Sequence, residues 1–381
     1  MELPLEQHPK DDIWVSEWEA RFKKERTKFY DFTREIDSIL SKNIKEQKTD
    51  VFAIEARTKS VQSFSEKIAR DDKDYKNPLS EITDLSGCRV ITFYNTDIDL
   101  IEGIVRENFS VDEANSPKKD AKDKPNEFGY LSRHLIVSFN SDRLKLPEYK
   151  RFKGLKAEVQ IRSVLQHAWA AIEHKLQYKQ SQNVPKPLQR RLFQISAMLE
   201  FADDQFHYLR KQIDNIRDEY RVELQATEGK VPVDAESIRV FLEESEKLES
   251  IFNNLDNRKF SIAPIHPSSA SPFGKLILTL TIARITDLTE LKRKISAKSD
   301  SEWENEFSTL FEKWKTAGYR DSLPRPGPPK LVLDTPNILR LVVYLISPDA
   351  LQKKILTQVP FGDRLQEALK AELLPEIRTL T

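Results

Sequence analysis

The spacing of hydrophobic residues predicts helices at the start of the chain and short strands after it. In residues 11–48, apolar residues such as Trp14, Phe22 and Ile36 recur at helical spacing, which indicates one or two amphipathic helices. Helical patterns at about residues 61–70 and 97–107 alternate with strand-like segments at residues 51–56, 88–94, 134–139 and 157–162. Strands mixed with helices in this way predict an α/β or α+β domain.

The strand predicted at residues 157–162 has one polar and one apolar face. Strict alternation places Glu158, Gln160 and Arg162 on one side and Val159 and Ile161 on the other. A carboxylate, an amide and a guanidinium side by side indicate a site that holds a charged group, through a metal ion in one interpretation. An edge strand with a solvated polar face is the alternative that this pattern leaves open.

A helix is predicted directly after this strand. Its apolar residues fall at the spacing of a single buried stripe: Leu165, Ala168, Trp169, Ile172 and Leu176. On its polar side, His167 and His174 lie seven residues apart, without the spacing of an H-E-x-x-H zinc site. We interpret these two histidines as structural or substrate-facing residues.

The remainder of the chain is predicted to be mainly helical. Residues 185–224 continue the helical pattern, and residues 225–233 resemble a linker. Asp234 is the predicted N-cap of a helix that runs through residue 248. Thr335 and Ser347, each followed by proline, are predicted N-caps of two further helices. No catalytic motif is legible in this half of the chain.

Length and composition favour two domains with hydrophobic cores, because the chain has 381 residues and 39% hydrophobic content. We expect N-terminal helices at 1–49, a central domain with its closing helices at 50–224, and a C-terminal domain at 231–381. The net charge is zero, so any basic site must be local. The single cysteine, Cys88, excludes an internal disulfide and a cysteine-based zinc site. The sequence has no long apolar run and no signal-peptide pattern, which favours a soluble cytoplasmic protein.

Two acidic residues are candidates for a magnesium site. Asp84 comes just before the strand at 88–94, and Glu158 lies on the polar face of its own strand. Carboxylates from two strands can converge on Mg²⁺, which prefers hard oxygen ligands and keeps waters for substrate phosphates. Nearby, Gly87 allows a close backbone approach and Arg89 projects from the strand. A capping or turn role for Asp84 and a structural ion pair for Arg89 are the alternatives.

Basic residues gather upstream of Asp84. Arg57 and Lys59 come from the end of one segment, and Lys67 and Arg70 share a face of the following helix, with Ser63 one turn before Lys67. Four converging cations suit a triphosphate, whose charge needs several donors. A solvated basic helix face is the alternative.

The segment Phe128-Gly-Tyr-Leu-Ser-Arg-His134 follows a nearly all-polar stretch at residues 112–127, which we interpret as a mobile surface loop. Glycine beside Tyr130 gives a turn that presents the ring as a stacking surface for a purine, and His134 begins a strand. A tyrosine packed in the core is the alternative. The sequence contains no Walker A loop and no G-x-G-x-x-G, so a nucleotide site here is of another kind.

Together these segments resemble the synthetase domain of the RelA/SpoT family, the (p)ppGpp or alarmone synthetases. The resemblance covers roughly residues 50–179 and rests on R-T-K with the basic helix, D-L-S-G-C-R-V-I, F-G-Y-L-S-R-H, and E-V-Q-I-R followed by Q-H-A-W-A-A-I-E-H. It implies an α+β fold with a mixed β-sheet flanked by helices, related to nucleotidyltransferases. It also implies transfer of the β,γ-pyrophosphate of ATP to the ribose 3′-hydroxyl of GDP or GTP.

The resemblance assigns roles to the residues at matching positions. It implies that ATP is bound by six residues: Arg57, Lys59, Ser63, Lys67, Arg70 and Arg89. Asp84 and Glu158 would hold Mg²⁺, and Glu158 would also activate the attacking hydroxyl. The guanine nucleotide would be bound by stacking on Tyr130 and by four polar residues: Lys124, His134, Gln160 and Arg162.

Departures from the family pattern leave open which molecule accepts the pyrophosphate. No His-Asp dipeptide occurs in the sequence, so alarmone hydrolysis by an HD-type domain is not expected. The extra C-terminal region raises a second hypothesis: a toxin-type relative, controlled by that region, that pyrophosphorylates tRNA 3′ ends or makes another toxic alarmone. A non-enzymatic nucleotide sensor is disfavoured, because both carboxylates and Tyr130 are present. The sequence is compatible with a homo-oligomer.

Overall fold

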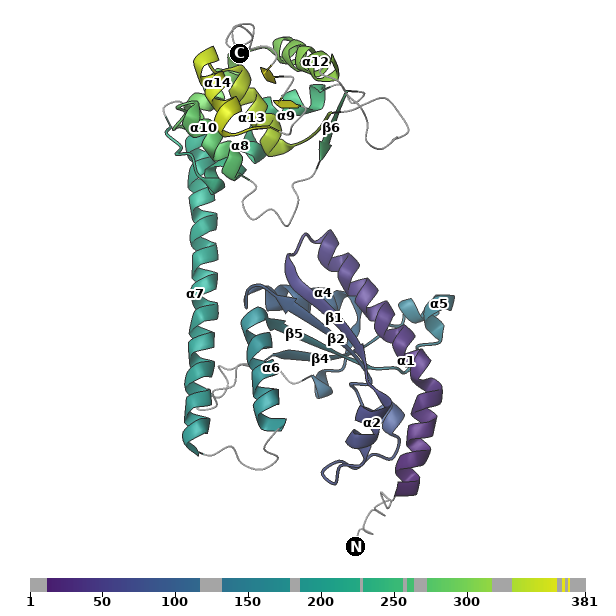
Figure 1. Ribbon diagram of the computed structural model, residues 1–381. Coiled ribbons are helices and arrows are strands. Elements are labelled where there is room, and N and C mark those ends of the chain that lie inside the picture. The colour runs from purple at the N-terminus through teal and green to yellow at the C-terminus, as the bar shows by residue number, and fades with distance from the viewer. Residues whose placement is uncertain are drawn as a thin grey trace, which may run out of the picture. The chain divides into compact units, whose positions relative to one another are not determined.

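The computed structural model describes residues 12–116, 132–178, 186–226, 229–255, 259–263, 273–316, 331–361, 365–366 and 369–370. The chain divides into two compact units, Met1–Arg210 and Lys211–Thr381. The first contains a mixed sheet flanked by helices and the second is mainly helical (Figure 1), so the predicted α+β class is confirmed. In the described part of the chain, no helix combines the length and the apolar character needed to cross a membrane.

The sheet of the first unit is built around a parallel pair of strands. The strand order is β1-β2-β5-β4-β3, and β2 and β5 run parallel while the other neighbours are antiparallel. The strands are β1 (Val51–Thr58), β2 (Ser86–Thr92), β3 (Ser110–Val111), β4 (Arg133–Ser138) and β5 (Ala157–Ser163). The register places Gly87 opposite Glu158, and both Arg89 and His134 opposite Gln160. Polar residues from three strands are therefore neighbours.

The hydrophobic core of the first unit lies on one face of this sheet. Its helices are α1 (Asp12–Glu46), α2 (Val61–Ile68), α3 (Pro78–Glu81), α4 (Asp97–Asn108) and α5 (Pro147–Lys150), with 3-10 turns η1 (Glu113–Asn115) and η3 (Arg143–Lys145). Phe22 and Phe32 of α1 are fully buried, and they share a core with α4 and with Val159 and Ile161 of β5. The alternation predicted for β5 is therefore confirmed, because its apolar side chains face this core.

Helix α6 (Val164–Tyr178) does not bury the apolar stripe predicted for it. Trp169 is buried, but Ile172 is 54% exposed. Gln166 is buried instead, because its side-chain oxygen accepts a hydrogen bond from the Ser163 N–H at the end of β5. That contact fixes the rotation of the helix, with Gln166 and Trp169 inward and Ile172 outward.

The second unit is built from helices and a two-stranded parallel sheet, β6 (Phe260–Ala263) and β7 (Leu331–Asp334). Its helices are α8 (Ala235–Glu244), α9 (Glu246–Asn254), α10 (Gly274–Ile282), α11 (Leu288–Ser296), α12 (Asp300–Thr316), α13 (Thr335–Leu345) and α14 (Asp349–Gln358). Each of these elements contributes buried apolar residues to one core. Residues 229–233, predicted as part of a linker, contribute to the same core through the fully buried Val231.

Helix starts in the second unit differ in part from those predicted. Asp234 caps α8 as predicted, because its carboxylate accepts hydrogen bonds from two backbone N–H groups. The helix predicted to continue from it is divided, since Ser245 ends α8 and caps α9. Thr335 and Ser347 are not N-caps: Asp334 caps α13, and α14 starts two residues after Ser347. At α13 the acceptor is the carboxylate one residue before the predicted hydroxyl, and aspartate is the stronger cap.

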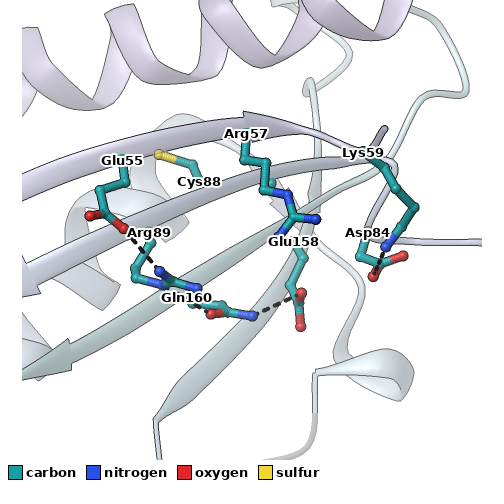
Figure 2. Close-up of a pocket in the computed structure, with 9 residues that line it drawn as sticks. Glu55, Arg57, Lys59, Asp84, Cys88, Arg89, Glu158 and Gln160 are labelled. Atoms are coloured by element: carbon teal, nitrogen blue, oxygen red, sulfur yellow. Dashed lines mark hydrogen bonds and ion pairs between the residues drawn. The ribbon is translucent and has the colours of Figure 1, made fainter. Parts of the chain in front are cut away.

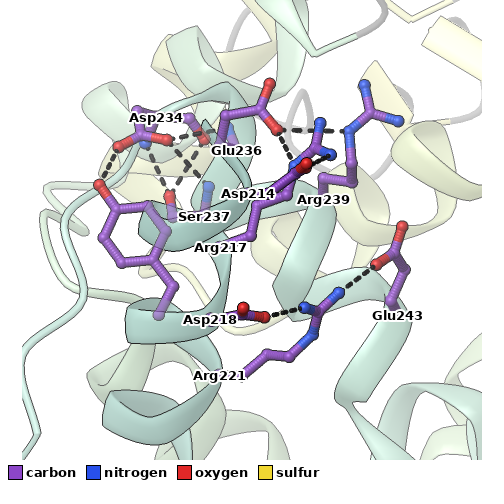
Figure 3. Close-up of polar contacts among 10 residues, drawn as sticks. Asp214, Arg217, Asp218, Arg221, Asp234, Glu236, Ser237, Arg239 and Glu243 are labelled. Carbon is purple, nitrogen blue, oxygen red and sulfur yellow. Dashed lines mark hydrogen bonds and ion pairs between the residues drawn. The ribbon is translucent and has the colours of Figure 1, made fainter. Parts of the chain in front are cut away.

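Helix α7 (Lys186–Gln225) begins in the first unit and ends in the second. Within the second unit its last turns are bound to α8 by ion pairs, of which Arg217–Glu236 is the shortest at 2.6 Å. Arg221 also approaches Glu243 at 3.5 Å. Figure 3 shows this network of charged residues. The C-terminal turns of α7 are therefore a structural part of the second unit.

Arg340 on α13 is a charged side chain buried among the described residues of the second unit, with 2% of its surface exposed. Its guanidinium donates to oxygen atoms of Thr279, Asn337 and Val359 and lies over the Phe361 ring. We expect Arg340→Met to lower the free energy of unfolding by about 2–4 kcal/mol, because buried acceptors lose their donor. Denaturant unfolding followed by circular dichroism measures this change.

The matched control is Arg293→Met, the same substitution at an exposed position of α11, which should change the free energy of unfolding by less than about 0.5 kcal/mol. Burial lowers the pKa of Arg340 to about 10, which reflects the cost of burying its charge. An Arg340→Met variant as stable as the unaltered protein would contradict this prediction and show that the cost of burying the charge offsets the hydrogen bonds.

Candidate active site

Charged side chains from β1, β2 and β5 surround one cavity on the polar face of the sheet. The cavity has a volume of about 200 Å³, and its wall is formed by Glu55, Arg57, Lys59, Asp84, Gly87, Cys88, Arg89, Glu158 and Gln160. Figure 2 shows how side chains from separate segments meet there. Six of the residues predicted from the sequence therefore lie around one space.

Asp84 is held by two lysines from different elements. Its carboxylate oxygens lie 2.9 Å from Lys59 Nζ and 2.9 Å from Lys67 Nζ. Lys59 follows β1 and Lys67 lies on α2, so the basic helix predicted from the sequence turns toward the acid that precedes β2. Burial alone would raise the pKa of Asp84, but the two lysines outweigh burial and hold that pKa below its usual value. The carboxylate is therefore ionised at neutral pH.

Glu158 is bound to His134 on the neighbouring strand β4. Its Oε1 lies 2.8 Å from His134 Nδ1, and its Oε2 accepts a hydrogen bond from Gln160 Nε2 at 3.0 Å. Burial alone would raise the pKa of Glu158, but these hydrogen bonds leave it below its usual value. The charge of Asp84 acts in the opposite direction on this pKa. The two carboxylates are therefore close enough to interact.

Two arginines extend the polar row along β2 and β5. Arg89 forms an ion pair with Glu55 at 2.9 Å and donates to Gln160 Oε1 at 3.4 Å, and Arg162 donates to the same oxygen. Arg162 is buried, which lowers its pKa to about 10. Because β5 lies between β2 and β4, the solvated edge strand is excluded. The row from Glu158 to Arg162 is one connected polar network.

A second cavity, of about 500 Å³, shares Arg57, Arg89 and Gln160 with the first. Its remaining wall is formed by Arg162, His167, Ala170 and Ala171. Within the described residues, His167 Nδ1 is buried and has no hydrogen-bond partner. Burial lowers the pKa of His167, as does the charge of Arg89. The ring is therefore neutral at neutral pH and faces a cavity.

Some residues of these walls were missed by sequence reasoning. Glu55 could have been found, because it alternates with Arg57 along β1. Cys88 is buried, which raises the pKa of its thiol to about 12 and leaves it protonated.

The role predicted for Gly87 is not supported. A Cβ at Gly87 would lie 3.6 Å from the Arg57 carbonyl oxygen, an ordinary contact. The glycine is therefore not required for the close backbone approach that we predicted.

Four predicted residues of the described part line neither cavity. Lys67 and His134 contact the wall residues Asp84 and Glu158, whereas Ser63 and Arg70 are bound elsewhere. The Ser63 hydroxyl accepts a hydrogen bond from Ser60 at 2.9 Å, and Arg70 pairs with Asp72 at 3.0 Å. Their roles toward ATP stay predictions. Four further predictions fall outside the described residues: Lys124, Tyr130, and the side chains of His174 and Leu176.

A mixed sheet that gathers two ionised carboxylates and several cations around one space is typical of proteins that bind phosphorylated ligands. A family model described as the region found in RelA / SpoT proteins matches residues 56–183. The chain is 29% identical over 161 residues to the GTP pyrophosphokinase YwaC of Bacillus subtilis, covering 42% of this chain and 73% of that relative. It is 30% identical over 165 residues to the GTP pyrophosphokinase YjbM of the same organism, covering 42% of this chain and 72% of that relative.

Among solved structures, the small alarmone synthetase 2 from Bacillus subtilis matches with 26% identity and a TM-score of 0.42, covering 50% of this chain and 98% of that one. The small alarmone synthetase 1 from the same organism, bound to its product pppGpp, matches with 25% identity and a TM-score of 0.41, covering 52% of this chain and 98% of that one. On the sequence match to YjbM, the chain belongs to the RelA/SpoT family.

Proposed function

We propose that this protein is a GTP pyrophosphokinase that transfers the β,γ-pyrophosphate of ATP to the 3′-hydroxyl of GDP or GTP. The observation that carries the proposal is the meeting of Asp84 and Glu158 with Arg57, Lys59 and Arg89 at one cavity. The names of two relatives, both GTP pyrophosphokinases, support it.

The cations bind the ATP phosphates in this proposal. Arg57, Lys59 and Arg89 line the first cavity, and Lys67 reaches it through Asp84. Guanidinium and ammonium groups together neutralise a triphosphate and hold it in one orientation. Ser63 and the exposed Arg70 complete the ATP set that the family pattern predicts, although they do not line either cavity.

The acceptor nucleotide is assigned to the side of β5 next to β4. His134, Gln160 and Arg162 lie there in one network with Glu158, so groups that contact the acceptor are joined directly to the candidate base. Two further acceptor residues predicted from the sequence, Lys124 and Tyr130, belong to the segment outside the described residues.

Asp84 and Glu158 fit a Mg²⁺ ion that is shared with the substrate. Within the described part of the chain, no group of three or more acidic, histidine or cysteine side chains could hold a metal ion. Magnesium bound through one or two carboxylates, with substrate phosphates and waters as its other ligands, is compatible with that donor set. Bound there, the ion would neutralise charge on the phosphate oxygens.

Glu158 is the proposed general base. It accepts the proton of the acceptor 3′-hydroxyl while that oxygen bonds to the β-phosphorus of ATP. The bond from this phosphorus to the α,β-bridging oxygen breaks, and AMP leaves. Cations around the phosphates stabilise the charge that moves onto the leaving oxygen, so that catalysis depends on positioning and electrostatics.

The test offers GDP, GTP and tRNA in parallel to the full chain with magnesium and γ-labelled ATP. Label should appear in a guanine nucleotide, whereas α-labelled ATP should yield labelled AMP alone. Label in tRNA, with GDP and GTP untouched, would overturn this acceptor and support the toxin-type alternative. Transfer to none of the three would contradict the proposed activity.

A further inference from the structure

The side-chain amide of Gln160 lies between two cations of the site and the proposed base (Figure 2). Its oxygen Oε1 accepts hydrogen bonds from Arg89 Nε at 3.4 Å and from Arg162. Its nitrogen Nε2 donates to Glu158 Oε2 at 3.0 Å. A glutamine amide offers two lone pairs and two N–H groups. Three of these four hydrogen-bonding positions are therefore occupied by residues of the site itself.

The charges around this amide favour one of its two orientations. In the observed orientation, the oxygen faces two guanidinium groups and an N–H faces a carboxylate. Rotation of the amide by a half turn would place its NH₂ group against the N–H groups of Arg89 and Arg162. It would also place the amide oxygen against Glu158 Oε2, so both ends would meet groups of like polarity. The direction in which Gln160 donates is therefore set by charge.

The two arginines are themselves held in place. The strand register places Arg89 opposite Gln160 on β2, where Arg89 forms an ion pair with Glu55 at 2.9 Å. Arg162 lies two residues after Gln160 on the same face of β5 and is only 6% exposed. A buried guanidinium does not readily leave its acceptor, because an unpaired buried charge is costly. The oxygen end of Gln160 is therefore bound to two anchored donors.

We propose that Gln160, fixed by Arg89 and Arg162, is a positioning residue for Glu158. The inference rests on the proposed function, in which Glu158 is the general base. Gln160 binds Oε2 of that carboxylate, and His134 on β4 binds Oε1 at 2.8 Å. Donors from two strands therefore fix the plane of the carboxylate. A base must lie within hydrogen-bonding reach of the proton that it removes, and a displacement of about 1 Å can cost about 100-fold in rate.

This role differs from the one that the sequence resemblance implies, in which Gln160 and Arg162 bind the acceptor nucleotide. The two roles predict different kinetics. A residue that only binds the acceptor changes the KM for that nucleotide. A residue that orients the base changes kcat and leaves the KM values of both nucleotides in place.

The first test replaces the amide with a carboxylate. Gln160→Glu keeps the length of the side chain and gives the two arginines an acceptor of opposite charge, so the free energy of unfolding should stay the same or rise. The new carboxylate repels Glu158 and cannot donate to it. We therefore expect kcat to fall by about 100-fold at pH 8 and saturating magnesium, with both KM values within about twofold of those of the unaltered protein. Preserved stability together with preserved kcat would show a purely structural role and overturn the proposal.

A second variant removes the donor without adding a charge. Gln160→Met should lower kcat by about tenfold and leave both KM values within about twofold, and it decides the question if circular dichroism shows that Gln160→Glu does not fold. The matched control is Gln205→Glu, at an exposed position of α7, which should leave kcat, KM and stability unchanged. A raised KM for the guanine nucleotide with kcat preserved would overturn the proposal and assign Gln160 to the acceptor.

The third test asks whether Arg162 acts through Gln160. Arg162→Met alone should lower kcat, because the amide loses one of the two donors that fix it. In the Gln160→Met background the same substitution should have no further effect on kcat, since the amide is already absent. Independent, additive effects on kcat would overturn this link.

Failure of this inference is distinguishable from failure of the proposed function. If the proposed function is wrong, the unaltered protein transfers no pyrophosphate to GDP or GTP. If only the inference is wrong, the unaltered protein transfers pyrophosphate and the Gln160 variants keep its kcat.

Discussion

Glu158→Gln is expected to reduce the rate of pyrophosphate transfer by about 10³-fold while leaving the fold unchanged. Glutamine has the same shape but cannot accept the 3′-hydroxyl proton, and general-base catalysis contributes about 10²–10⁴-fold. Gln160 and His134, which contact the carboxylate, have polar partners in the variant too. Formation of labelled guanine nucleotide from γ-labelled ATP, with circular dichroism as the fold check, measures the effect.

The matched control is Glu148→Gln, the same change at an exposed position of α5, which should leave the rate within about twofold. The pKa of Glu158 is below its usual value of 4.5, so its carboxylate is ionised from pH 8 down to pH 5. The transfer rate should therefore show no decrease from protonation of Glu158 between pH 8 and pH 5. A Glu158→Gln variant that keeps a tenth or more of the rate would refute the role of general base.

Asp84→Asn is expected to reduce transfer by about 10²–10³-fold and to raise the magnesium concentration needed for half-maximal rate. The amide is a poorer ligand for a hard cation, and it no longer balances the charges of Lys59 and Lys67, which lie 2.9 Å from the carboxylate. Titration of the rate with MgCl₂, for the protein and the variant side by side, separates the loss of metal affinity from a loss of turnover.

The same variant has a stability readout with a defined pH dependence. The pKa of Asp84 is held below its usual value of 3.8 in the folded state. The ionised carboxylate therefore contributes to the free energy of unfolding above pH 3.8, and this contribution is lost as the pH falls further. The difference in unfolding free energy between protein and variant should shrink in that acidic range.

The control for the transfer rate is Asp142→Asn, at an exposed ion pair with Lys145, which should show normal transfer. An Asp84→Asn variant with normal rate and magnesium dependence would remove Asp84 from the site.

Much of the candidate site was predictable because its residues are ordered by local patterns. Period-2 alternation assigned Glu158 and Gln160 to one face of β5, and the core on the other face follows from Val159 and Ile161. The position of Asp84 before a hydrophobic strand marked it as a second acid. These features depend on neighbours in sequence, so the sequence carries them directly.

Other features were not predictable because they depend on contacts distant in sequence. The pairing of Glu158 with His134 follows from the antiparallel register of β4 and β5, and no local pattern fixes that register. The apolar stripe predicted on α6 was wrong for the same reason: the hydrogen bond between Gln166 and the Ser163 N–H sets the rotation of the helix.

The sequence by itself determined the class of the fold, the family and the chemical types gathered for the site, because periodicity and motif spacing are properties of the chain alone. Only the tertiary structure decided that Lys59 and Lys67 both hold Asp84, that Arg162 is buried, and that His167 faces a cavity. The physical reason is that burial and charge pairing depend on which surfaces meet when the chain folds, and strand register and helix rotation settle that only once all the elements are packed together.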